Sequence, residues 1–376
     1  MRQLLPFLML SLGAACGGKT LPILPIGSPA PDFALPGVDG KTHTLSDYSK
    51  SPVLAIVFTC NHCPASQLYE RRIRTLHEDY RDKGVALVAI NPNHPGSIAL
   101  GELAYTDVGD SLAEMKSRAA YRHIEYPYLY DGDSQTVSRA FGVAATPEIF
   151  VFDQRRTLQY QGRIDDSVRE DGVKRRDARH AIEALLSGQK ISVARTTASG
   201  CPTKWRATTS AREQERATIA TEPVKLDMAG ADALKKLRGN GTGKLLLVNF
   251  WATWCGPCAT EFPDLVTTYG MYRSRNFDFV SVSSNDPEEK PQVLAFLEKH
   301  HASSTNLQFA TPDMFGLQAA FDPLMPSAVP FTVLIAPNGD IVYQELGELD
   351  FLKVRRAILA NLPDDKYPGH QAHWRE

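Results

Sequence analysis

The sequence predicts an α/β fold of two tandem domains, each a central mixed β-sheet flanked by helices. The chain has 376 residues, which is more than one ordinary domain of roughly 100–200 residues contains. Short apolar runs rich in β-branched residues alternate with longer amphipathic segments, which is typical of strands that alternate with helices. The order of these segments in the first half recurs in the second half, and this internal repeat indicates two related domains.

The first half is predicted to contain three strands and three helices. In chain order we expect a strand at 53–59, a helix at 64–82, a strand at 85–91, a helix at 109–122, a strand at 148–153 and a helix near 177–187. The runs at 53–59 and 85–91 are mostly apolar, which is typical of buried strands. The first domain is placed at residues 27–190.

The second half repeats this order. In chain order we expect a strand at 245–251, a helix at 257–273, a strand at 277–283, a helix at 288–301, strands at 331–336 and 341–346 around an Asn-Gly turn, and a helix at 350–361. The second domain is placed at 222–363. Residues 191–221 have the composition of a linker, and the polar tail at 364–376 is expected to be loose.

Composition and charge exclude some functions. Apolar residues make up 43% and charged residues 22% of the chain, and the formal net charge is −2. Without an excess of basic residues, nucleic acid is not an expected partner. No internal run approaches the roughly 20 apolar residues that a membrane-spanning helix needs.

The first 16 residues have the pattern of an export signal. A basic start, a short apolar stretch and small residues precede Cys16, as in segments removed after export. Lipid modification of Cys16 and plain cleavage after Ala15 remain open. Either route predicts a bacterial cell-envelope location, periplasmic or lipid-anchored, where disulfides persist.

Four cysteines form two Cys-x-x-Cys pairs, Cys60/Cys63 and Cys255/Cys258, each between a predicted strand and a predicted helix. A thiolate at a helix N-terminus is stabilised by free backbone N–H groups, so the first cysteine of each pair is the expected nucleophile. The second cysteine, one turn further on, can resolve a mixed disulfide. Zinc ligation is disfavoured because the pairs lie far apart in the chain, and so short a loop gains little from a purely structural disulfide.

The motifs around these cysteines resemble the thioredoxin superfamily. The run Trp251-Ala252-Thr253-Trp254-Cys255-Gly256-Pro257-Cys258 resembles the exported TlpA/ResA group of thiol–disulfide oxidoreductases. The run Phe58-Thr59-Cys60-Asn61-His62-Cys63-Pro64 resembles AhpC/TSA-type redoxins. A peroxiredoxin carries a threonine three residues before its peroxidatic cysteine, whereas Thr59 directly precedes Cys60. This departure favours disulfide exchange over peroxidase activity in the first domain.

The resemblance implies roles for further residues. It implies a cis-proline loop that faces the cysteines and binds the substrate backbone, at Thr146-Pro147 in the first domain and at Val329-Pro330 in the second. Glu261 matches an acidic residue that serves the second cysteine as a proton acceptor, although complementing the helix dipole is an alternative role. Trp251 and Trp254 are expected to pack around the second site as an apolar collar, with Trp254 in the substrate-binding part, and a plain core position is the alternative for either.

His62 and Cys201 are the remaining candidate site residues. An imidazole between the first two cysteines would stabilise the Cys60 thiolate and make that couple the more oxidising one, unless His62 faces solvent. The second domain is then the stronger reductant. Cys201 is a possible third redox cysteine that reaches Cys60 or Cys63, or else a buried packing residue.

The predicted function is an exported thiol–disulfide oxidoreductase with two sites. Its expected partners are protein thiols or disulfides and an upstream membrane or periplasmic electron donor, and no cofactor or metal is predicted. Thiol peroxidase activity of the first domain is one alternative. A Cu(I) metallochaperone that uses Cys60, His62 and Cys63 is another.

Overall fold

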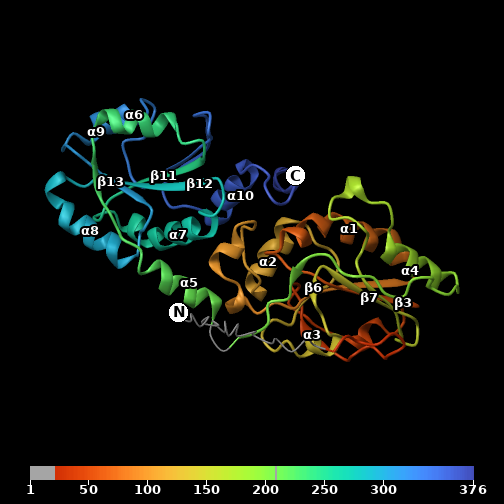
Figure 1. Cartoon of the computed structure of the whole chain (residues 1–376). Helices are drawn as coiled ribbons and strands as arrows, with labels where there is room; N and C mark the ends of the chain where they lie inside the picture. The colour runs from red at the N-terminus through yellow and green to blue at the C-terminus, as the bar shows by residue number, and fades with distance from the viewer. Residues whose placement is uncertain (1–21, 208–209) are drawn as a thin grey trace, which may run out of the picture.

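The computed structural model describes residues 22–207 and 210–376 (Figure 1). The predicted export signal and Cys16 lie outside the described residues. The chain forms two successive α/β units, each with helices on both faces of a mixed sheet (Figure 1). This confirms the fold class predicted from the sequence.

The first domain is built on a five-stranded sheet in the order β5-β4-β3-β7-β8. β3, β4 and β5 are parallel to one another, and β7 and β8 are antiparallel to their neighbours. The strands of this domain are β1 (Ala34–Pro36), β2 (Thr42–Thr44), β3 (Val53–Phe58), β4 (Val85–Asn91), β5 (Tyr128–Tyr130), β6 (Ala145–Thr146), β7 (Glu148–Phe152), β8 (Leu158–Gly162) and β9 (Cys201–Pro202). Its helices are α1 (Pro64–Tyr80), α2 (Leu112–Tyr121), α3 (Thr136–Phe141) and α4 (Asp177–Leu186), with short 3₁₀ helices η3 (Pro95–Ser97), η4 (Leu100–Leu103) and η5 (Glu170–Gly172).

β3 lies at the centre of this sheet because its side chains are apolar on both faces. Val53, Ala55 and Val57 pack in the core under α1 and α4. The alternate residues Leu54, Ile56 and Phe58 pack in a second core with Phe141 of α3. Since successive side chains of a strand point to opposite faces, a continuous apolar run fills both layers.

The second domain has a six-stranded sheet in the order β10-β13-β12-β11-β14-β15. The first four strands in this order are parallel, and β14 and β15 are antiparallel. The strands are β10 (Asp227–Ala229), β11 (Leu245–Trp251), β12 (Phe277–Ser283), β13 (Thr305–Phe309), β14 (Phe331–Ile335) and β15 (Ile341–Leu346). Its helices are α6 (Ala231–Gly239), α7 (Gly256–Tyr272), α8 (Lys290–Lys299), α9 (Met314–Phe321) and α10 (Phe351–Asn361), while α5 (Ala211–Ile219) precedes this domain and α11 (His370–Arg375) follows it.

The segment predicted as a linker is partly built into the first domain. The backbone of Thr196 bonds to Gln161 of β8, and β9 pairs antiparallel with β6. Further on, α5 packs near η3 and η4 of the first domain. Low periodicity therefore reflects irregular backbone fixed by hydrogen bonds to the first domain, rather than a free connection.

The prediction of a loose tail after Pro363 is wrong. Residues 370–375 form helix α11, and only 3% of the Trp374 side chain is exposed. The Trp374 ring lies under the Arg118 guanidinium at 4.8 Å, and His370 Nε2 is 2.7 Å from Gln67 Oε1 of α1. The tail is ordered because its aromatic residues pack on the first domain, which a composition argument does not detect.

The two domains share a buried contact. Ile98, Leu100 and Leu103 of the first domain extend the core that lies under α7 and α10 of the second. The Asp107 carboxylate, which is fully buried, binds Arg118 of the first domain and Arg356 of α10. Both domains therefore supply the cations that neutralise one buried carboxylate.

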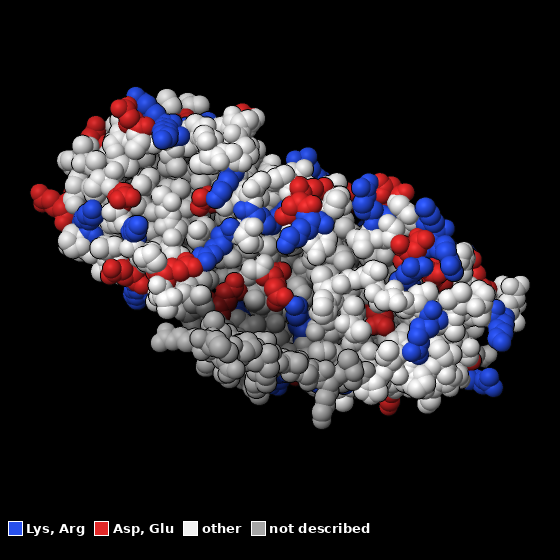
Figure 2. Space-filling view, in the orientation of Figure 1, with Lys and Arg blue, Asp and Glu red and all other residues white. Residues whose placement is uncertain are grey.

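On the face shown in Figure 2, Lys and Arg side chains alternate with Asp and Glu over both domains. This mixed distribution agrees with the net charge of −2 and shows no extended basic surface on this face. Among the described residues, no helix has the length and apolar character that crossing a membrane requires.

Candidate functional site

The first cysteine loop lies between β3 and α1. α1 begins at Pro64 and Cys63 is its N-cap residue, because proline at the first helical position needs no hydrogen-bond partner for its nitrogen. Only 5% of Cys60 and none of Cys63 is exposed. The loop is therefore at the helix N-terminus, as the sequence predicts, but it is buried.

The cysteines of the first loop are not joined to each other. Cys63 forms a disulfide with Cys201, which is 138 residues further on, and Cys60 is a free, buried thiol. The sequence leaves two roles open for Cys201, a third redox cysteine or a packing residue. In the structure Cys201 is the disulfide partner of Cys63. This pairing removes Cys63 as a free ligand, so the set Cys60, His62 and Cys63 does not offer Cu(I) two thiols in this form.

His62 is enclosed in the site rather than facing solvent, since 3% of it is exposed. Its Nδ1 is 2.6 Å from Asp110 Oδ2. Burial alone would lower the pKa of His62, but the Asp110 carboxylate and then the Cys60 sulfur raise it well above its usual value. A charged imidazolium beside a sulfur atom is the arrangement that favours a nucleophilic cysteine.

Asp110 is the site residue that the sequence analysis misses. It accepts hydrogen bonds from the backbone N–H groups of Asn61 (2.8 Å) and His62 (3.1 Å), and from Asn93 Nδ2 (2.8 Å). Burial alone would raise its pKa, but His62 holds the pKa of Asp110 below its usual value. No local motif marks Asp110, because its contact with the loop spans 48 residues.

Cys60, His62 and Asp110 offer donor atoms that all lie within 4.8 Å of one another. The carboxylate of Asp110 already accepts several hydrogen bonds, one of them from the ring of His62. The group is therefore arranged as a thiol, an imidazolium and an orienting carboxylate, which is the geometry of an activated nucleophile.

Thr146 lies against both sulfur atoms of the first loop. Its Oγ1 is 3.2 Å from Cys60 Sγ, and its carbonyl oxygen is 3.4 Å from Cys63 Sγ. The Thr146-Pro147 bond is cis, as is Val329-Pro330 in the second domain, and both match the expectation from the resemblance. In the second site the carbonyl oxygen of Val329 is 3.7 Å from Cys255 Sγ.

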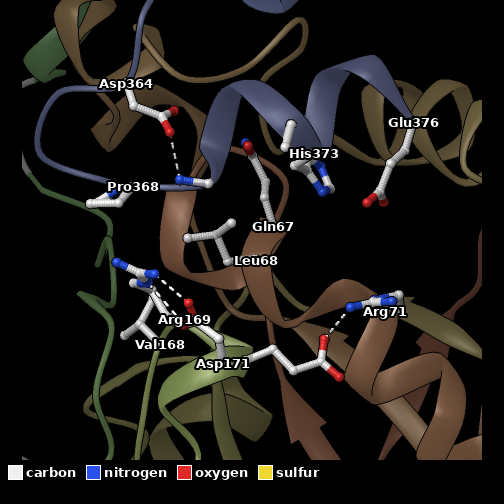
Figure 3. A pocket seen from close by; sticks show the side chains of 13 residues that line it. Gln67, Leu68, Arg71, Val168, Arg169, Asp171, Asp364, Pro368, His373 and Glu376 are labelled. Carbon is white, nitrogen blue, oxygen red and sulfur yellow. Dashed lines mark hydrogen bonds and ion pairs between the residues drawn. The ribbon is translucent and has the colours of Figure 1, made fainter.

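A cavity of about 450 Å³ lies beside the first loop, between α1, the segment around η5 and the tail (Figure 3). Its charged side chains are largely paired with each other, Arg71 with Glu170 and Arg169 with Asp171. Val168 lines the cavity. Val168 and Cys201 both pack on the group of Cys60, Cys63 and Ala65. Val168 therefore separates the cavity from the sulfur atoms.

The second cysteine loop lies between β11 and α7. Cys255 is the N-cap residue of α7 and is joined to Cys258 by a disulfide, with 5.3 Å between their Cα atoms. Cys255 is 7% exposed and Cys258 is fully buried. Trp254, which is 60% exposed, lies at the surface, whereas Trp251 is fully buried in the core. Of the expected collar, only Trp254 is available to a substrate.

Glu261 lies in α7 under the second disulfide, and 3% of it is exposed. Burial raises the pKa of Glu261 to about 7, although hydrogen bonds from Leu349 N (3.0 Å) and Asn249 Nδ2 (3.3 Å) oppose this shift. A buried carboxyl that titrates near neutral pH can accept or return a proton. The burial distinguishes it from an exposed glutamate that only complements the helix dipole.

Each half of the chain matches a protein-family model. Residues 26–161 match the AhpC/TSA family, and residues 220–358 match Redoxin. Two strand-to-helix cysteine loops that each face a cis-proline loop agree with these matches. The chain therefore belongs to the thioredoxin superfamily.

Curated relatives are named thiol-disulfide oxidoreductase ResA. The protein from Halalkalibacterium halodurans is 31% identical over 114 residues, which cover 30% of this chain and 58% of the relative. That from Bacillus subtilis is 33% identical over 100 residues, 27% of this chain and 51% of the relative. The chain thus spans about half the length of the curated relatives it matches. Among solved structures, a hypothetical protein from Sinorhizobium meliloti is 33% identical with a TM-score of 0.44, covering 49% of this chain and 96% of that protein.

Proposed function

We propose that this chain is a thiol–disulfide oxidoreductase that exchanges disulfides with protein partners at both cysteine loops. The observation that carries the proposal is the arrangement of residues at the second site. There a disulfide between Cys255 and Cys258 lies at the N-terminus of α7, with the buried Glu261 beneath it and the exposed Trp254 beside it. This arrangement combines an attacking sulfur at a helix N-terminus beside an exposed side chain, a resolving sulfur and a proton acceptor.

The test is reduction of insulin by the full chain with dithiothreitol as electron source. We expect Cys255→Ser to lower the rate to that of dithiothreitol alone if the second site is the main reductant. Cys60→Ser is the matched variant for the first site. Unchanged rates in both variants would contradict the proposal.

The two sites are proposed to have unequal reduction potentials. The imidazolium of His62, whose charged form Asp110 favours, places a positive charge beside Cys60, whereas Gly256 and Pro257 at the second site carry no charge. A stabilised thiolate makes a couple more oxidising. Equilibrating Cys255→Ser/Cys258→Ser and Cys60→Ser/Cys63→Ser/Cys201→Ser full chains in glutathione buffers should give the lower potential for the second site, and the reverse order would contradict this.

A second candidate function is thiol peroxidase activity at Cys60. It is favoured by the environment of this free thiol, since the hydroxyls of Thr146 and Ser66 lie 3.2 and 3.7 Å from its sulfur. Attack of Cys60 on a peroxide would give a sulfenic acid and an alcohol or water. Peroxide consumption that Cys60→Ser abolishes would support this function, and equal consumption by the variant would exclude it.

Export is proposed from the first 16 residues, with an upstream membrane or periplasmic electron donor as partner. The motif that ends at Cys16 supports either lipid attachment or plain cleavage. The mass of the N-terminal peptide of the mature protein separates these outcomes, and a retained Met1 would contradict export by this route.

A further inference from the structure

A strand of the chain itself covers the first site. β9 pairs antiparallel with β6, and Cys201 lies opposite Thr146, the residue that touches both Cys60 and Cys63. The segment whose cysteine is joined to Cys63 thus has its backbone at this edge. In this structure the edge is filled by residues 200–202.

Gly200 permits this close approach. A Cβ atom added at Gly200 would lie 2.0 Å from the carbonyl oxygen of Thr146 and 3.0 Å from the nitrogen of Pro147. Both are backbone atoms, which cannot move aside cheaply. The position before Cys201 therefore accepts only glycine while β9 is docked.

The flanks of β9 are fixed to the first domain. Thr203 N donates to the carbonyl oxygen of Ala144, and Lys204 N donates to Asn93 Oδ1 at 2.8 Å. Arg139 stacks over the ring of Trp205 at 4.7 Å. Between Thr196 and the anchors at Lys204 and Trp205, residues 197–203 can leave the edge while they stay tethered.

The second domain has the corresponding edge free. Val329 precedes the cis proline and lies near Cys255, but among the strands of the described residues none pairs with the backbone at Val329. Trp254 and Leu324 are strongly exposed in the same domain, at 60% and 92%. The difference between the two sites is thus the presence of β9 at the first.

We propose that β9 is an internal client of the first site, released when Cys60 moves the disulfide from Cys63–Cys201 to Cys60–Cys63. The inference rests on the proposed thiol–disulfide exchange. Cys60 Sγ loses its proton and attacks Cys63 Sγ. The bond between Cys63 and Cys201 breaks, and Cys201 leaves as a thiolate that takes up a proton. No electron is gained or lost overall.

Release of Cys201 would free the edge at Ala145 and Thr146 for an external client. The ligand class that fits is an extended peptide with a cysteine opposite Thr146 and glycine directly before that cysteine, as Gly200 precedes Cys201. Such a peptide would form the same backbone pairing that β9 forms.

The test is a disulfide map of the full chain, made by alkylation and mass spectrometry in glutathione buffers. Gly200→Ala should shift the pairing from Cys63–Cys201 to Cys60–Cys63 by at least about tenfold, because the added methyl group overlaps Thr146. Gly239→Ala is the matched control, since a Cβ there meets no atom within 4 Å. An unchanged map in Gly200→Ala would overturn the proposal.

A second measurement follows the strand itself. Cys60→Ser keeps Cys63–Cys201 and should hold β9 in place, whereas Cys201→Ser allows Cys60–Cys63 and should release it. Hydrogen exchange of the Thr203 amide, which bonds to Ala144 directly before β6, should be faster in Cys201→Ser, and equal rates would count against release. Neither measurement depends on enzymatic activity. A full chain that does not reduce insulin would therefore contradict the proposed function, whereas the proposal about β9 is decided by the disulfide map and by hydrogen exchange.

Discussion

Asp110 stabilises the first cysteine loop through two backbone N–H groups and the ring of His62. It thereby acts as a positioning residue, since it fixes the imidazolium that lies beside Cys60. The raised pKa of His62 means that this ion pair stabilises the folded state from the pH at which Asp110 ionises up to the pKa of His62, and that the contribution is lost above and below this range.

We expect Asp110→Asn to destabilise the protein by about 3 kcal/mol at pH 7, because it breaks a buried ion pair. The rate of Cys60 alkylation in the native protein should fall as well. Without the Asp110 carboxylate the pKa of His62 is lower, so less imidazolium is present to stabilise the Cys60 thiolate. Urea unfolding and iodoacetamide labelling measure the two effects. Asp82→Asn is the control, with a carboxyl that is 90% exposed, and an equal loss of stability in both variants would contradict the expectation.

Glu261 predicts a pH dependence of the second domain. Burial raises its pKa from an ordinary value near 4.5 to about 7, so the unfolded chain loses this proton first as the pH rises. Stability therefore falls between these two values. In Glu261→Gln the free energy of unfolding should fall by about 2 kcal/mol less over this pH range, a figure that allows for solvent screening at the edge of the site.

The measurement is urea unfolding of both proteins at pH 5 and pH 8, together with the pH profile of insulin reduction. The profile should lose its change near pH 7 in Glu261→Gln. Asp264→Asn in the same helix is the control, because Asp264 is exposed. A profile that keeps its change near pH 7 in Glu261→Gln would show that another group titrates.

Helix α11 is stabilised by packing on the first domain. The ring of Trp374 is 3% exposed and contacts Arg118, and His370 lies against Gln67. Burial lowers the pKa of His370 to about 4, with the charge of Arg275 contributing, so the docked helix carries a neutral imidazole at neutral pH.

Trp374→Ala should cost about 3 kcal/mol, because it removes a large buried ring. Trp254→Ala, which removes an exposed ring of the same size, should change stability by less than about 0.5 kcal/mol. Thermal unfolding measures both. Similar costs would mean that α11 is not packed in solution.

The elements that the sequence predicts well are those with a strong local pattern. β4, β11, β12 and β15 have the predicted bounds, because apolar runs between turn residues define them. β9 and α11 escape prediction because each is short and is held by residues far along the chain. The same holds at the first site, where the Cys60 and Cys63 positions follow from a motif but the Cys63–Cys201 pairing spans 138 residues.

At the scale of the molecule, Asp107 joins the domains by binding Arg118 and Arg356. Tyr272 Oη adds a hydrogen bond of 2.7 Å to the carbonyl oxygen of Thr106. Because these contacts are buried and continuous with the core of the second domain, the two domains should unfold together.

Asp107→Ala should cost about 3 kcal/mol, since it leaves the buried Arg118 without its carboxylate. It should also split the single calorimetric transition into two, because the domains lose their shared anion. Asp79→Ala, which removes a partly exposed ion pair with Arg179 inside the first domain, should cost less than about 1 kcal/mol and keep one transition. One transition in Asp107→Ala would show that the remaining contacts are enough to couple the domains.

The contact between His370 and Gln67 spans 303 residues. A ribosome makes the first cysteine loop long before it makes the helix that packs beside it, and N-terminal domains generally fold before synthesis of the chain is complete. Until residues 370–375 are made and packed, Gln67, which holds the carbonyl oxygen of Asn61 in the loop, lacks the partner that His370 provides, and this side of the loop lacks the cover of the finished protein.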